Sequence, residues 1–94
     1  MAVTFEWDPK KAAANAKKHG VTFDEAATAF NDAFGLVVDD PRHSVGEARA
    51  VLLAHSQQRR LLAVMFTERH DRIRLISARK ATRREHRAYE EGAS

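Results

Sequence analysis

The chain has 94 residues, of which 44% are hydrophobic and 31% are charged, a composition typical of one small globular domain spanning residues 1–94. The absence of cysteine excludes a disulfide framework and a thiolate metal site, and no apolar run is long enough to cross a membrane. No export signal is visible either, so the expected location is the cytoplasm.

The charge is distributed unevenly, although the net value is only +3. Residues 1–40 carry four Lys against seven Asp and Glu, whereas residues 41–94 carry eleven Arg and one Lys against six acids. Arginine grips phosphate with a planar, two-pronged fork and stacks on bases. The second half therefore favours a nucleic-acid ligand over a merely solvated surface.

The first third of the chain predicts one strand and two helices. Residues 3–7 alternate apolar and polar side chains, and Asp8 follows as the expected N-cap of a helix that ends near Gly20. Thr22 and Glu25 have the spacing of a capping box, which predicts a second helix. Its expected core face is formed by Phe23, Ala26, Ala27 and Phe30.

The remainder predicts four strands and a last helix. The apolar runs are 35–39, 47–55, 59–67 and 72–78, and short polar turns join the last three into an antiparallel meander. Thr82 and Glu85 repeat the capping-box spacing and open a helix that is expected to keep Tyr89 on its surface. The predicted order is β-α-α-β-β-β-β-α, an α+β fold with the helices packed on one face of an antiparallel sheet.

Strand periodicity then assigns the charged side chains to faces. In the last strand, Arg72 and Arg74 share one face, and the other is expected to hold Ile73, Leu75, Ser77 and Arg79. In the strand over 47–55, Glu47 and Arg49 lie on one side. They are either a catalytic pair or a surface ion pair of little energetic value.

Several short motifs, in order from Phe5 to Tyr89, resemble the BrnT family of toxins of type II toxin–antitoxin modules. They are Phe5-Glu6-Trp7-Asp8, Lys11-Ala12 with Asn15, Lys18-His19-Gly20-Val21 with Phe23, Gly46-Glu47 with Arg49, Thr67-Glu68-Arg69, and Ile76-Ser77-Ala78-Arg79. One departure is Ala54, where the family pattern has a glycine. The resemblance implies a RelE-like fold, a ribonuclease that arrests translation, and a BrnA-like antitoxin with a ribbon-helix-helix portion. Operator DNA would be contacted only through that antitoxin.

The resemblance also implies a site that needs neither a metal nor another cofactor. Ribonucleases of this kind use the RNA 2′-hydroxyl as nucleophile and need an acid, a base and cations around the phosphate. His19 or Glu47 would transfer protons. Phosphate contacts are expected from Lys18, Arg49 and Arg79, and further RNA contacts from Arg69, Arg72, Arg74, Arg83 and Arg87.

Each of these roles has a simpler competitor. His19 lies at the end of a helix, where an imidazolium can act only as a cap. Arg83 and Arg87 lie one turn apart and could pair with the acids that follow them instead of RNA. For the whole chain, the alternative is a module that binds nucleic acid or antitoxin without catalysis, such as a toxin relic that has lost its activity.

Overall fold

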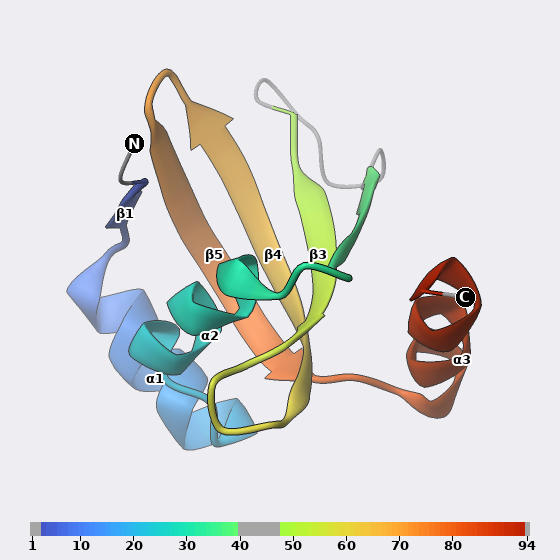
Figure 1. Ribbon diagram of the computed structural model, residues 1–94. Coiled ribbons are helices and arrows are strands. Elements are labelled where there is room, and N and C mark those ends of the chain that lie inside the picture. Colours follow the sequence, from blue (N-terminus) through green and yellow to red (C-terminus); the bar gives the residue numbers. More distant parts are fainter. Residues whose placement is uncertain (1–2, 40–47, 94) are drawn as a thin grey trace.

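A computed structural model of the chain, which describes residues 3–39 and 48–93, contains one five-stranded sheet and three α-helices (Figure 1). The elements are β1 (Thr4–Glu6), α1 (Pro9–His19), α2 (Phe23–Thr28), a 3-10 turn (Ala29–Asn31), β2 (Leu36–Asp39), β3 (Ala50–His55), β4 (Leu61–Arg69), β5 (Arg72–Lys80) and α3 (Arg83–Ala93). This confirms the α+β fold and the predicted order of the helices and strands, to which the structure adds the 3-10 turn.

The sheet has the strand order β1-β5-β4-β3-β2. Strands β3, β4 and β5 form the predicted antiparallel meander, and β2 adds antiparallel to β3. The first strand instead pairs parallel with the last, through Phe5 and Ile73. Since β1 ends at Glu6, no strand of the described residues lies beside the second half of β5 on this edge, and α1 packs there instead.

The helix ends follow the signals in the sequence. The Asp8 side chain accepts a bond of 2.8 Å from the backbone N–H of Lys10, and α1 stops at Gly20, whose φ of 70° is readily adopted by glycine. The Thr22 hydroxyl accepts a bond of 3.0 Å from the N–H of Glu25. The side chain of Glu25, however, turns to other partners, so only half of that capping box forms.

The main core lies between the sheet and the pair α1 and α2. Its fully buried side chains include Phe23, Leu62 and Leu75. Phe30 joins this core by edge-to-face contacts with Phe5 and Phe66, each with ring centroids 5.1 Å apart. The predicted core face of α2 is therefore confirmed.

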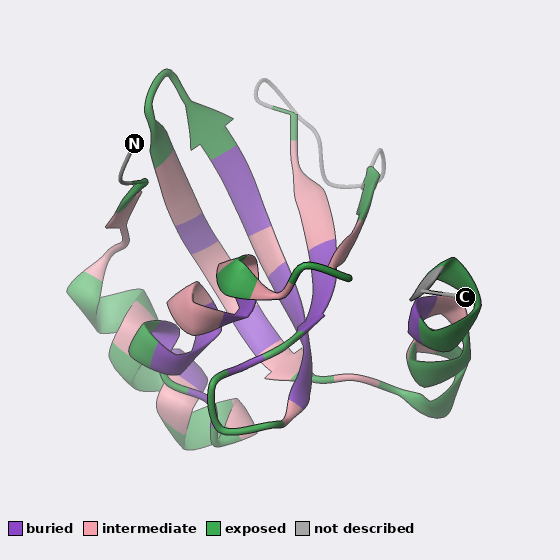
Figure 2. Cartoon of the chain, viewed as in Figure 1, coloured by how far each residue is buried: buried purple, intermediate pink, exposed green. Residues whose placement is uncertain are grey.

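The third helix packs on the opposite face, which corrects the expectation that all helices share one face. A second, smaller cluster joins Leu53, Leu61 and Ala63 to Tyr89 of α3. These strand residues alternate with Leu52, Leu62 and Val64 of the main core, so they point to the other side of the sheet. Figure 1 shows α3 apart from α1 and α2, beyond β3, and Figure 2 shows that most of its surface is exposed.

The expectation that Tyr89 lies on the surface of α3 is also wrong, because Tyr89 is only 9% exposed. The ring packs in the small second cluster, and its hydroxyl donates to the half-buried carboxylate of Asp32. No helix in the described part of the chain is long and apolar enough to span a membrane.

Candidate functional site

A β-bulge in β5 decides which face carries Arg79. Phe66 pairs with Leu75, but the preceding residue Met65 pairs with Ser77, so β5 has one extra residue at this point. Side-chain alternation is thereby interrupted, and Arg79 pairs with Ala63 of the α3-side cluster. The expectation that Arg79 shares a face with Leu75 is wrong.

As a result, the α3-side face of the sheet gathers arginines from two adjacent strands. Arg74 pairs with Thr67, and Arg72 pairs with Arg69 near the β4–β5 turn. Cross-strand partners lie on the same face, as do alternate residues of a strand. The set, which we call the cationic face, consists of Arg69, Arg72, Arg74 and Arg79.

The side chains of the cationic face differ in exposure and in their contacts. Arg74 donates to Glu6 of β1 at 3.0 Å, and both side chains are half-buried. Arg69 and Arg72 are both exposed and stand directly opposite each other. Like charges that face each other directly on adjacent strands destabilise a sheet.

Arg79 has the best-defined environment of the predicted site residues. Its Nη1 and Nη2 donate to the two carboxylate oxygens of Glu85, at 2.7 and 3.0 Å. This hydrogen-bonded pair lowers the pKa of Glu85 and raises that of Arg79, so both are charged at neutral pH. Glu85 also completes the capping box that opens α3, since it accepts from the N–H of Thr82 at 2.9 Å.

Lys18 and His19 lie beside the same strand, on its open edge. Asn15 fixes α1 there: its side chain donates to the carbonyl of Ala78 at 2.8 Å and accepts from the N–H of Ala78 at 3.1 Å. Lys18 and His19 then line a hollow of about 210 Å³ together with Ser77, two residues before Arg79. The structure thus places Lys18 and His19 at the same end of β5 as Arg79.

The other predicted site residues lie further away or outside the described residues. Arg49 precedes β3, is half-buried, and lines a hollow of about 280 Å³ with Thr67 and Glu68. Arg83 and Arg87 are exposed on α3. Glu47, the candidate carboxylate for proton transfer, lies outside the described residues.

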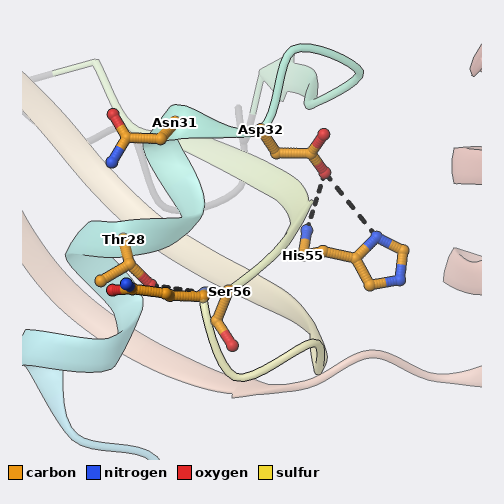
Figure 3. Close-up of a pocket in the computed structure, with 6 residues that line it drawn as sticks. Thr28, Asn31, Asp32, His55 and Ser56 are labelled. Atoms are coloured by element: carbon orange, nitrogen blue, oxygen red, sulfur yellow. Dashed lines mark hydrogen bonds and ion pairs between the residues drawn. The ribbon is translucent and has the colours of Figure 1, made fainter.

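Two polar networks were not predicted. In the first, Asp32 accepts from the backbone N–H of His55 at 2.9 Å, and His55 Nδ1 is 3.7 Å from the same carboxylate (Figure 3). Asp32 also accepts from the hydroxyl of Tyr89 at 2.7 Å. Burial, reinforced by Asp32, raises the pKa of Tyr89 to about 12. The hollow beside this network has about 460 Å³ and is lined by Thr28, Asn31, Asp32, His55, Ser56 and Gln57.

The second network surrounds the buried carboxylate of Glu25. Ser56 donates to it at 2.7 Å and Arg60 Nε at 2.8 Å, and a second Arg60 nitrogen contacts its other oxygen. Arg60 also donates to the carbonyl of Gly20 at 3.0 Å, so the network ties the end of α1 to α2 and to the β3–β4 turn. Both networks join residues more than 20 positions apart, and no local sequence pattern marks them.

The comparison with known families identifies the kind of protein to which the chain belongs. Residues 7–85 match the profile of a family described as the ribonuclease toxin BrnT of type II toxin–antitoxin systems. The chain belongs to this family of ribonuclease toxins. The resemblance inferred from the sequence motifs is therefore confirmed, and a type II toxin implies a cognate antitoxin.

A solved structure supports the fold. The 1.1 Å crystal structure of the ribonuclease toxin BrnT of Brucella abortus is similar to this chain with a TM-score of 0.63 and 20% sequence identity, over 87% of this chain and all of that one. At this identity the likeness shows a shared architecture, including the mostly antiparallel sheet and its helices. No curated protein matches the chain.

Proposed function

We propose that this toxin is a metal-independent endoribonuclease that cleaves RNA by attack of the 2′-hydroxyl on the adjacent phosphate. The observation that carries the proposal is the convergence at one end of β5 of Arg79, brought to the cationic face by the bulge, with Lys18 and His19 on the strand edge. Cations there stabilise the charge that develops on the phosphorane, which neutral side chains would not do.

The proposed roles follow from chemistry and position. Arg79 and Lys18 contact the scissile phosphate. Arg49, which precedes β3 and lies two strands away from β5, provides a further cation to the RNA backbone. His19 or Glu47 transfers protons, as base for the 2′-hydroxyl or as acid for the leaving 5′-oxygen. His19 is half-buried and is the last residue of α1, next to Lys18.

RNA upstream and downstream of the scissile bond would follow the cationic face. Arg69, Arg72 and Arg74 extend from the catalytic end of β5 towards the β4–β5 turn, and Arg83 and Arg87 add exposed cations on α3. Contacts of this kind fix the position of the backbone and do not read sequence.

The test is cleavage of RNA by the purified protein in excess EDTA. We expect cleavage to continue, with products that end in a 2′,3′-cyclic phosphate or a 3′-phosphate, and we expect DNA of the same sequence to remain intact because it lacks the nucleophile. Loss of activity with the chelator, 5′-phosphate products, or equal cutting of DNA would contradict the mechanism.

We also propose that the antitoxin has a BrnA-like ribbon-helix-helix portion and covers the cationic face and α3. An acidic or amphipathic segment would neutralise the arginines and block RNA at the same time. The same cleavage assay with the antitoxin in excess measures this directly. Full inhibition is expected, and tight binding without inhibition would place the antitoxin elsewhere.

A further inference from the structure

We infer that Glu85 is a positioning residue for the reaction: it holds the guanidinium of Arg79 by one edge so that another edge is presented to the RNA phosphate. The inference rests on the proposed function, because it requires Arg79 to contact the scissile phosphate. Glu85 itself touches no part of the RNA in this arrangement and acts only through Arg79.

The hydrogen bonds of Arg79 show which edge is held. A guanidinium has five N–H groups. Nη1 donates to Glu85 at 2.7 Å and to the backbone carbonyl of Lys80 at 3.3 Å, and Nη2 donates to Glu85 at 3.0 Å. These bonds occupy one N–H of Nη2 and both N–H groups of Nη1.

Two donors of Arg79 remain, namely Nε–H and the second N–H of Nη2. They lie side by side on one edge of the guanidinium, and neither has a partner among the described residues. Such an edge matches two oxygens of a phosphate in a bidentate contact. The Arg79 side chain is 31% exposed, so a phosphate can reach it.

Glu85 is well suited to fix this orientation because its own position is fixed. Its carboxylate accepts from the N–H of Thr82 at 2.9 Å, and its own N–H donates to the Thr82 hydroxyl at 3.2 Å. The start of α3 therefore holds the carboxylate, and the carboxylate holds the arginine. The lowered pKa of Glu85 keeps this acceptor ionised at neutral pH.

The alternative role for Glu85 is competition with the phosphate for Arg79. A competitor would have to leave before RNA binds, which would break two charge-assisted hydrogen bonds and half of a capping box. Because the other edge of Arg79 has two donors available, RNA can bind without that loss. The geometry thus favours positioning.

The experiment compares Glu85→Gln with Glu90→Gln in the purified, full-length toxin. Glutamine keeps the length and the capping-box acceptor of Glu85 but removes its charge, so α3 should remain folded. Glu90 is exposed on the same helix, and its replacement makes the same change in net charge. Single-turnover cleavage of one RNA gives the rate of the chemical step, and binding to an RNA with a 2′-deoxy cleavage site gives the affinity.

For Glu85→Gln we expect the chemical rate to fall about tenfold while RNA affinity changes less than about twofold, because orientation of Arg79 matters most in the transition state. Glu90→Gln should match the wild type. In an Arg79→Lys background, Glu85→Gln should have no further effect on the rate, since lysine has no fork to orient.

The outcomes distinguish failure of the role inferred for Glu85 from failure of the proposed catalytic site. Tighter RNA binding with faster cleavage by Glu85→Gln would make Glu85 a competitor and overturn the inference. A slow Arg79→Ala variant together with a wild-type Glu85→Gln would also overturn it, and would leave the proposed site intact. A wild-type rate for Arg79→Ala would instead overturn the proposed site itself.

Discussion

The two faces of the sheet differ in what covers them and in what they do with arginine. On the α1 and α2 side, aliphatic and aromatic side chains such as Leu62 and Phe23 fill a continuous core. On the α3 side the apolar cluster is small, and the rest of the face gathers arginines. Folding stability therefore concentrates on one face, and the other is available for a charged ligand.

Two arginine–glutamate pairs show the same difference between a part of the molecule that stabilises the fold and a part that is open to ligand. Glu25 is buried, and with Arg60 and Ser56 it ties three segments of the chain together. Glu85 and Arg79 are both partly exposed, and one edge of the Arg79 guanidinium has no partner within residues 3–39 and 48–93. The satisfied, buried pair stabilises the fold, whereas the partly exposed pair on the cationic face includes the arginine that we propose binds phosphate.

The largest expected effect contrasts matched leucines on the two faces. Leu62→Ala removes a fully buried side chain from the main core and should lower the free energy of unfolding by about 3–5 kcal/mol. Leu53→Ala, in the small cluster beneath α3, should cost about 2–3 kcal/mol because α3 can settle into the space. Urea unfolding with unchanged m-values measures both, and equal losses would contradict the contrast.

A smaller effect should come from Glu25 as the pH falls. Its hydrogen bond with Arg60 is the main cause that lowers the pKa of Glu25 from 4.5 in the folded state. A depressed pKa contributes stability that is fully present above the unfolded value and is lost as pH falls through the folded value. We therefore expect Glu25→Gln to cost about 1–3 kcal/mol at pH 7 and progressively less below about pH 4.5.

Urea unfolding of wild type and Glu25→Gln at pH 7, 5, 4 and 3 measures this difference. Asp24→Gln is the control, because Asp24 is an exposed acid on the same helix. A constant difference between wild type and Glu25→Gln across the whole range would mean that ionisation of Glu25 does not stabilise the fold.

The sequence predicted well those features that depend on neighbours in the chain. Asp8, Gly20 and Thr22 mark helix ends through bonds to residues at most four positions away, and all three are confirmed. The meander was predictable because short polar turns leave antiparallel pairing as the simple solution. The family motifs were equally local.

Features that depend on distant contacts could not be read in this way. The bulge that turns Arg79 to the cationic face arises from the register of β4 against β5. The burial of Tyr89 depends on Asp32, 57 positions earlier. Alternation assigned Arg79 to the wrong face because it assumes an uninterrupted strand, and a single extra residue reverses every assignment beyond it.

The smallest expected effect tests whether the cationic face binds RNA at some cost to the fold. Arg72 is exposed and stands directly opposite Arg69, so Arg72→Ala removes a like-charge pair and should leave the melting temperature unchanged or slightly raised. RNA affinity should nevertheless fall by about twofold to tenfold at low salt, because one phosphate contact is lost. The slope of log affinity against log salt should become shallower by about 0.7, the value for one contact to a single strand.

The control is Lys10→Ala, which removes the same charge at the start of α1 and not on the cationic face. It should leave the RNA affinity and the salt slope unchanged. If Lys10→Ala and Arg72→Ala weaken binding equally, RNA responds only to net charge, and the face has no special role in binding.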